Sequence, residues 1–518
     1  MFKNNRTEFL STSSRVFGFF LAGLLALVLI WFVASGVRLA AGLSVLGILL
    51  VGFYFLGNFE KAYFPFIFFI ILPVALFVTA IPGLRAFELV IPGIFILFLL
   101  RQVVLGWRQR QARFVPKSII LFFAMGLASF LRHPSLPAQV FAAGADPGNF
   151  RVYWNFFLGL MTYVLTFHLF REGRRRKTLV LVRLMTTVCV SGLILQFIDP
   201  YLRIPLPLGE IFVHWGPYGE AAESGGPLFR GWAVGWFGLF LFLVLISFSN
   251  IPKNKLVKSA FFLLSLAGII LSGARSILLA AVGTASLLCL LKGRIWRLLV
   301  PLSAAAAILA VSYFYPQTID RLPEGVRRVF TIFPTPGYGD PDAVGSALVR
   351  VAWWTEALEI ISRHPLVGIG FERIGVEARY LAYADYAVRI GQAHSAYIAT
   401  GVMLGLPGIV VLAWIFALHL LRGIILSRQP APAVEQNLAT WLTLMVFGYN
   451  IIFFFAGAPQ VLYSYFLFAG LINLTWIRRN ERDRDASHTG PPRMENLLTE
   501  NGGRPEVEAS GGNDRQRL

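Results

Sequence analysis

Long apolar runs of about twenty residues, separated by short polar segments, cover most of the chain as far as residue 477. A helix needs roughly 20 apolar residues to cross a bilayer core about 30 Å thick. By this criterion the pattern predicts about fourteen membrane-spanning helices. The predicted spans are residues 16–34, 38–57, 62–81, 86–106, 117–132, 150–170, 178–198, 231–250, 256–273, 276–292, 296–315, 394–421, 436–456 and 459–477.

Composition agrees with this pattern, because 56% of the 518 residues are hydrophobic and only 14% are charged. A chain this apolar is not typical of a soluble globular protein. The first run follows Arg15 and is longer than the core of a signal peptide, so we expect it to remain as an anchor. The expected fold is therefore an all-α polytopic membrane protein with one large extracytoplasmic helical loop.

The positive charges predict which loops lie in the cytoplasm, since basic loops resist translocation. With an internal N-terminus and fourteen spans, all eight lysines fall on the cytoplasmic side, as do the arginine-rich segments 101–113 and 171–177. Both chain ends are then cytoplasmic. The net charge of +19 is mostly explained by topology, which leaves little support for nucleic-acid binding.

Two further features are assigned structural roles. The tail from about residue 477 is polar and rich in Gly, Pro, Asn and Asp, so we expect it to be disordered. Cys189 and Cys289 both lie inside apolar runs, where a structural thiol is expected rather than a disulfide or a metal ligand.

The largest predicted outer segment, residues 316–393, contains eight arginines, nine acidic residues and no lysine. Arginine binds phosphate through two nitrogens at once, although translocated loops also simply avoid lysine. Within this segment the spacing of apolar residues predicts a helix over 346–365 that ends at Pro365. Its face with Trp354 would lie on the membrane surface and hold Arg350 at the interface. Pairing of Arg350 with a carboxylate or a lipid headgroup is the alternative.

Two more candidates stand at predicted span ends on the outer side. Arg275 lies in LSGARS between two apolar runs, and His394 begins the small-residue run HSAYIATGVMLGLPG. An arginine at a span end can snorkel to the interface without any function, and an interfacial histidine can be an ordinary helix-start residue. Neither residue is diagnostic by itself.

The order of these motifs resembles the O-antigen ligase and O-antigen polymerase superfamily. In that family, an arginine in a Ser/Gly-rich turn precedes an R-x-x-x-W-like helix with P-L-x-G-x-G after it, and then a histidine opens a glycine-rich helix. Here the order is Arg275, then Arg350 with Trp353 and Trp354, then residues 365–370, then His394. The resemblance covers about residues 255–415 and rests on the ordered set.

The resemblance implies an integral membrane glycosyltransferase of the GT-C kind in the bacterial inner membrane. Its donor would be a polyprenyl-diphosphate-linked glycan and its acceptor a saccharide or a lipid-linked saccharide, with the large loop periplasmic. Two arginines can stabilise the charge on a departing diphosphate, so we expect neither a metal nor a cofactor. A neutral His394 can take the proton from the acceptor hydroxyl. The expected catalytic residues are His394, Arg350 and Arg275.

Further residues are expected to contact the substrates. Besides the two arginines, these are Trp354, Tyr397, His214 and Arg230. Asp340 and Asp342 have the D-x-D spacing of some metal-dependent glycosyltransferases, and a flexible linker is the favoured explanation. The expected regions are 1–254 (N-terminal spans), 255–415 (the ligase-like region with loop 316–393), 416–477 (C-terminal spans) and 478–518 (the tail).

Two alternatives stay open. Within the transferase class, the sequence does not distinguish a ligase, which moves a finished glycan, from a polymerase, which joins repeat units. The other class is a transporter or flippase for a lipid-linked glycan or polysaccharide. A transporter usually needs ionisable groups near the middle of the bilayer, whereas the charges of this chain collect at the span ends.

Overall fold

The structure, a computed structural model, describes residues 59–71, 86–105, 115–132, 148–202, 232–319, 321–322, 324–330, 353–370, 395–455 and 462–488. All regular structure in these residues is helical. The chain divides by its contacts into two units, Met1–Asn473 and Leu474–Leu518. The last helix crosses this boundary, and its end is the described part of the second unit.

Each predicted span from 62–81 onward contains a helix, whereas the spans 16–34 and 38–57 lie outside the described residues. The long helices are α3 (Tyr63–Ile71), α4 (Ala86–Leu105), α5 (Lys117–Arg132), α7 (Gly148–Arg171), α8 (Arg174–Leu202), α10 (Trp232–Ser247), α11 (Lys255–Leu271), α12 (Arg275–Leu291), α13 (Leu299–Phe314), α17 (Ala396–Arg428), α18 (Ala433–Phe455) and α19 (Leu462–His488). Short helices are η1 (Phe59–Ala62), η4 (Ile295–Leu298), α14 (Pro316–Ile319) and α15 (Glu324–Phe330).

Among the described helices, three are long and apolar enough to cross a membrane. They cover Arg174–Leu195, Ala396–Arg428 and Ala433–Phe455, and shorter apolar helices cover Val234–Ser247, Arg275–Leu291 and Ile295–Val311. Large apolar side chains also face outward, as Leu256 does with 80% of its surface exposed. A soluble protein avoids such a surface, but a bilayer solvates it. These helices support a helical membrane protein, and the number of crossings remains a prediction.

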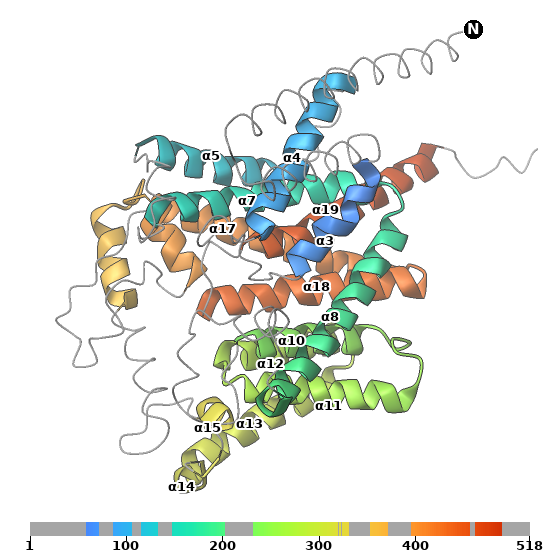
Figure 1. Ribbon diagram of the computed structural model, residues 1–518, viewed down its shortest axis with the longest axis vertical. Coiled ribbons are helices and arrows are strands. Elements are labelled where there is room, and N and C mark those ends of the chain that lie inside the picture. The colour runs from blue at the N-terminus through green and yellow to red at the C-terminus, as the bar shows by residue number, and fades with distance from the viewer. Residues whose placement is uncertain are drawn as a thin grey trace, which may run out of the picture. The chain divides into compact units, whose positions relative to one another are not determined.

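Helix α18 forms the centre of the described bundle. Residues 441–446 are buried on every side of this helix, which is typical of a helix surrounded by other helices. The helices α10, α12 and α17 pack against it (Figure 1). Trp441 is completely buried there, with its ring 5.6 Å from that of Phe468 in α19.

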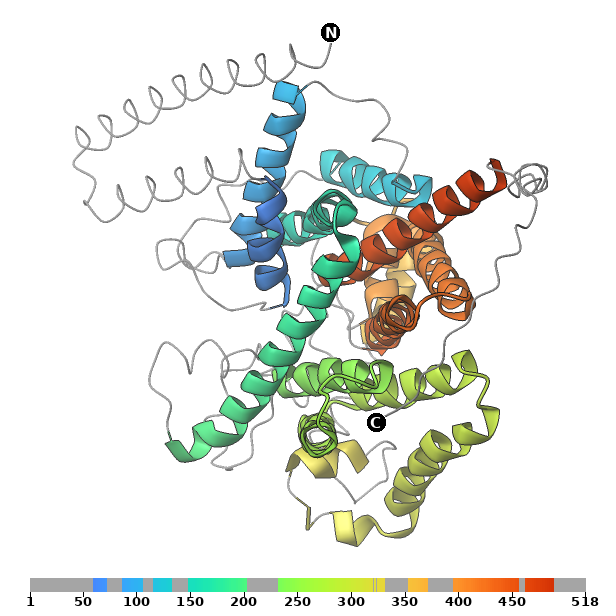
Figure 2. The same cartoon turned by 90° about the vertical axis from the view of Figure 1, so that its right-hand side faces the viewer.

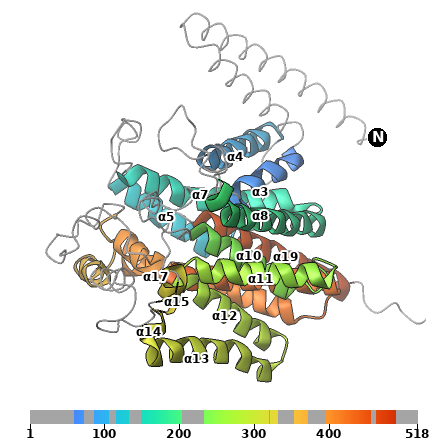
Figure 3. The same ribbon diagram turned by 60° about the horizontal axis from the view of Figure 1, so that its bottom comes forward.

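A second group of helices is formed by α10, α11, α12 and α13, the green to olive helices in the lower part of Figure 2. Gly238 of α10 lies so close to α11 that a Cβ would come within 2.8 Å of the Ile269 nitrogen. Small residues allow this approach of two backbones. Helix α13 lies at the edge of the group (Figure 3), and most of its side chains are exposed.

Lysines bind the carbonyl ends of two helices at turns predicted to be cytoplasmic. Lys177 Nζ donates to the Leu169 carbonyl at 2.6 Å, and Lys258 Nζ donates to the Phe248 carbonyl at 2.8 Å. A positive charge is favourable at a helix C-terminus, where carbonyls lack partners and the helix dipole is negative. These lysines therefore have a local structural role besides the predicted topological one.

Candidate functional site

The turn that carries Arg275 is fixed by its own hydrogen bonds. Ser272 Oγ donates to the Ile269 carbonyl at 2.8 Å and accepts from the Ala274 amide at 3.2 Å. Gly273 has a φ of 64°, a conformation that glycine adopts without strain. Ser272 and Ala274 are buried, whereas Arg275, the first residue of α12, is half-buried. The backbone that carries the Arg275 side chain is therefore fixed by hydrogen bonds.

Two arginines that the sequence motifs did not single out lie in α15. This helix packs against α11, α12 and α13, at the end of that group where α11 passes into α12 (Figures 1 and 3). Arg328 is only 9% exposed, which is unusual for a charged side chain, and Arg327 is half-buried. Segment 316–393 therefore contributes arginine side chains to the helix group that includes α12. Among the described arginines of this segment, Arg328 alone is buried.

The described part of the predicted helix 346–365 is helical over residues 353–363, followed by a turn at 364–367, and residues 346–352 lie outside the described residues. The buried face of this helix consists of Trp353, Ala357 and Ile361. Trp354 is half-buried and Leu358 is 55% exposed, and the contact of this side with the membrane surface stays a prediction. The sequence pattern thus combined two faces, because apolar residues occupy both.

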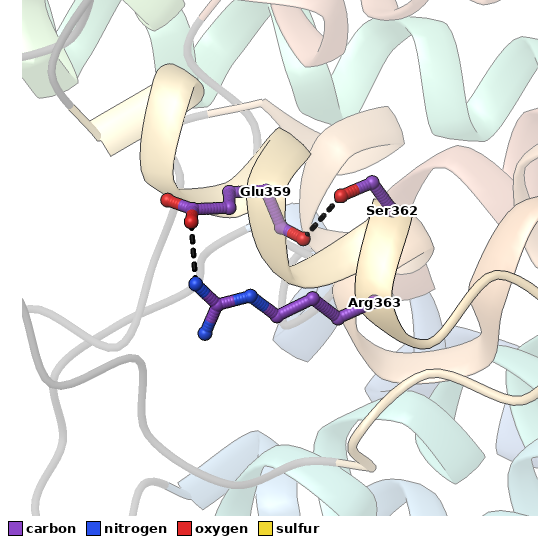
Figure 4. A network of polar contacts seen from close by, with 3 residues as sticks. All are labelled: Glu359, Ser362 and Arg363. Atoms are coloured by element: carbon purple, nitrogen blue, oxygen red, sulfur yellow. Dashed lines mark hydrogen bonds and ion pairs between the residues drawn. The ribbon is translucent and has the colours of Figure 1, made fainter.

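The polar side of helix 353–363 carries an exposed ion pair. Arg363 contacts the Glu359 carboxylate at 2.5 Å, one helical turn away, and Ser362 Oγ donates to the Glu359 carbonyl (Figure 4). Exposed pairs of this kind contribute little to stability. Arg363 therefore serves as a reference for an arginine of the outer segment with an ordinary surface role.

Helix α17, which starts just after His394, is broken in its first third. Gly405 has φ 72° and ψ −172°, which interrupts the helix, and Pro407 follows. Proline has no amide hydrogen to give the carbonyl four residues earlier, so Met403 loses its helical partner. Backbone groups at a break require other partners, above all inside a membrane.

The segment 365–370 supplies these partners. The Ile369 amide donates to the Val402 carbonyl at 2.8 Å, and the Gly370 amide donates to the Met403 carbonyl at 3.2 Å. In return, the Leu406 amide donates to the Pro365 carbonyl at 2.8 Å. Both sides approach through glycine: a Cβ on Gly368 would lie 2.4 Å from the Val402 oxygen, and one on Gly405 would lie 2.6 Å from the Pro365 oxygen. The P-L-x-G-x-G motif is thus bound to the glycine-rich helix.

The start of α17 is capped and packed into the bundle. Ser395 Oγ accepts from the Ile398 amide at 3.5 Å, which makes Ser395 the N-cap residue. Tyr397 points between α17 and α18, where its hydroxyl donates to Asn450 Oδ1 at 3.3 Å and its ring lies 5.5 Å from that of Phe416. These contacts hold Tyr397 as a packing residue, and its contact with a substrate stays a prediction.

Several predicted site residues lie outside the described part of the chain. These are His394, Arg350, His214, Arg230, Asp340 and Asp342. The described neighbours of the motifs are nevertheless brought together. Helix 353–363 leads into the segment bound to α17, and α17 in turn packs against α12, which begins with Arg275. The three motifs thus belong to contiguous elements.

A buried polar cluster inside the bundle was not anticipated. His419 of α17 is completely buried, and its Nδ1 lies 2.7 Å from the Ile415 carbonyl. Its Nε2 and the hydroxyls of Tyr163 and Tyr465 have no hydrogen-bond partner among the described residues. Arg422, one turn further along, bonds to Asn473. Ionisable groups therefore occur inside α17 as well as at the ends of the predicted spans.

The family comparison agrees with the motif order. Residues 260–413 match the family model described as O-antigen ligase, close to the region 255–415 that carries the resemblance. A comparison with curated proteins finds no match to the chain. The matched region contains α12, α15, helix 353–363 and the broken start of α17. The resemblance to the O-antigen ligase and polymerase superfamily is therefore confirmed over residues 260–413.

Proposed function

We propose that this chain is an integral membrane glycosyltransferase that moves a glycan from a polyprenyl-diphosphate carrier to a saccharide acceptor. The observation that carries the proposal is the O-antigen ligase match over residues 260–413, whose motif-bearing elements pack together. Transfer would take place at the outer face of the inner membrane, with segment 316–393 periplasmic and without a metal. The first spans, 1–254, and the last, 416–477, would build the bundle around this region.

The proposed reaction exchanges one C–O bond for another. The acceptor hydroxyl oxygen attacks the anomeric carbon, and the bond from that carbon to the diphosphate oxygen breaks. The polyprenyl diphosphate leaves with the electron pair, and the hydroxyl proton passes to the imidazole of His394. Arg275 and Arg350 would stabilise the charge that develops on the diphosphate, since a guanidinium can contact two phosphate oxygens.

The surroundings of the two described motif elements suit this role. Arg275 starts from a turn held by Ser272, so little ordering is needed when it binds an anion. The buried Arg328 of α15 adds positive charge in the same region. Trp354 lies on the outward face of helix 353–363, where it can contact lipid or the glycan, and His214 and Arg230 are further proposed contacts.

The decisive experiment replaces His394 by alanine in purified protein with a lipid-linked glycan donor. Loss of a general base lowers the rate by typically 10²–10⁴-fold. We expect a loss of this size in His394→Ala at an unchanged melting temperature. His364→Ala is the matched control, because His364 is an exposed histidine in the same outer segment. Near-parental transfer by His394→Ala would show that His394 is not the general base.

A second candidate function, transport of a lipid-linked glycan, is supported by the buried cluster around His419. Buried ionisable groups in a membrane-spanning helix often mark ion or substrate pathways. His419, Arg422 and their neighbours on α7 and α19 are such a group. A transporter would move labelled donor across a liposome membrane without an acceptor, whereas the transferase would consume donor only when an acceptor is present.

A further inference from the structure

The P-L-x-G-x-G segment has a physical role that follows from its contacts. Helix 353–363 begins three residues after Arg350, and α17 begins two residues after His394. Segment 365–370 directly follows helix 353–363 and its turn. Among the described residues, it joins this helix to α17 through three backbone hydrogen bonds at the break in α17. Any shift of this segment along α17 would move helix 353–363 relative to the start of α17.

We propose that segment 365–370 and the break at Gly405 form a clamp that positions helix 353–363, which follows Arg350 in the chain, against α17, which follows His394. The clamp is thus a positioning element of the proposed transferase and rests on that function. Gly368 and Gly405 are its positioning residues, because each lies where only a glycine fits: both have positive φ, and both would carry a Cβ within 2.6 Å of a carbonyl oxygen of the other side.

The hydrogen bonds explain why the clamp is specific to this register. In an unbroken helix the Leu406 amide would bond the Val402 carbonyl, whereas here it bonds the Pro365 carbonyl. The Val402 and Met403 carbonyls are then free to accept from Ile369 and Gly370. A slip by one residue would leave buried carbonyls without donors, which is costly in a low-dielectric environment. Pro407 keeps the helix from closing again, since it cannot donate to Met403.

The exposed side chains on both sides of the clamp are apolar: Leu366 is 74% exposed and Leu406 is 50% exposed. Irregular backbone inside a bilayer is tolerated where protein groups satisfy it, and apolar side chains suit its lipid-facing side.

The first experiment compares two glycine variants. Gly368→Ala should lower kcat about 100-fold, because misplacing reacting groups by about 1 Å can cost this much. Gly293→Ala is the matched control: Gly293 has the same positive φ, 63°, but a Cβ there would meet nothing within 4 Å. It should keep parental kcat, and both variants are compared per amount of folded protein at a temperature below both melting transitions. Parental kcat in Gly368→Ala would overturn the clamp.

The second experiment tests the contact between segment 365–370 and α17 in a protein that retains both Gly368 and Gly405. In a background free of Cys189 and Cys289, Leu366→Cys with Leu406→Cys should be joined efficiently by a short bifunctional thiol reagent. Leu366→Cys with Trp414→Cys is the control pair, since Trp414 is also exposed but lies about two turns further along α17. The joined protein should remain active. Loss of activity on joining, or equal joining of both pairs, would overturn the proposal.

Two readouts separate positioning from a general effect on folding. In Gly368→Ala, joining of the 366 and 406 thiols should slow at a temperature at which the variant is still folded. Low activity with unchanged joining would overturn the positioning role. Failure of the proposed function is distinct, because it appears as full transfer by His394→Ala. Failure of the clamp appears as full transfer by Gly368→Ala under conditions in which His394→Ala is inactive.

Discussion

Arg275, the proposed ligand of the diphosphate, follows a turn that is fixed by hydrogen bonds. Its guanidinium starts from a turn in which Ser272 both donates and accepts a hydrogen bond and Gly273 takes a left-handed conformation. A planar guanidinium holds two phosphate oxygens in fixed directions, whereas an ammonium is a compact point charge. Geometry and charge can therefore be separated at this position by a conservative change.

Arg275→Lys should reduce transfer by about 100-fold or more, similar to the loss of one preorganised donor to a developing negative charge. The charge and the turn are retained, so accumulation and melting temperature should stay at parental values. The assay measures kcat and KM for the lipid-linked donor. Arg363→Lys is the control, since Arg363 forms an exposed pair with Glu359 and should tolerate lysine. Equal rates for both variants would show that Arg275 contributes only to topology or to general electrostatics.

At the scale of elements, apolar run length predicted the helices well. Every predicted span from 62–81 onward contains a helix, because about twenty apolar residues have few other ways to satisfy their backbone in lipid. The ends were less well predicted: α17 continues to Arg428, beyond the expected end at residue 421. Leu420 and Leu421 are followed by Arg422, which the hydropathy pattern assigns to an interface although it bonds to Asn473.

The break in α17 was not predicted, for a physical reason. Glycines in membrane helices often allow neighbouring elements to pack closely, and Gly401 does so, since a Cβ there would lie 2.7 Å from Ile361. Gly405 and Pro407 can also end a helix, but whether they do depends on a partner for the freed backbone groups. That partner is segment 365–370, and sequence patterns do not reveal which distant segment donates.

The buried cluster of α7, α17 and α19 gives a prediction that separates the two candidate functions. The His419 ring lies 6.0 Å from that of Tyr163 and 6.2 Å from that of Tyr465. In a transferase this imidazole, about three turns beyond Gly408 on α17, has only a packing role. His419→Leu should therefore keep kcat within about twofold, a change of less than about 0.5 kcal/mol in the barrier.

The same variant is informative for transport. A transporter that uses the buried imidazole would lose donor movement across liposomes in His419→Leu, without a change in accumulation. Tyr163→Phe provides the matched control, since it removes a hydroxyl of the cluster but no ionisable nitrogen. Loss of glycan transfer in His419→Leu at an unchanged melting temperature would contradict the packing role. It would indicate that the buried cluster takes part in glycan transfer.

At the scale of the whole molecule, the order of three weak motifs predicted the family and the region that the family model matches. The contact of segment 365–370 with α17 could not be predicted in the same way. It consists of backbone hydrogen bonds, which leave little trace in side-chain patterns. Arg328 was missed for a similar reason, because its burial depends on how α15 packs against α11 and α12.

The proposed reaction requires that residues 316–393 and the turn at Arg275 face the same, outer compartment. The distribution of lysines predicts this arrangement, because basic loops are retained in the cytoplasm. It also places the turn at 248–254 inside the cell. Two exposed serines report on these locations, Ser362 on helix 353–363 and Ser249 in the turn between α10 and α11.

Single cysteines at these two positions, introduced after Cys189 and Cys289 are replaced, should react differently with a membrane-impermeant maleimide. In intact spheroplasts Ser362→Cys should be labelled and Ser249→Cys should not, and both should be labelled after the membrane is permeabilised. Both proteins must retain transfer activity, so that the labelled molecules are folded ones. Labelling of Ser249→Cys alone in intact cells would invert the topology, and Arg275, Arg350 and His394 would then face a cytoplasmic donor. Labelling of both would contradict the odd number of crossings predicted between the two positions.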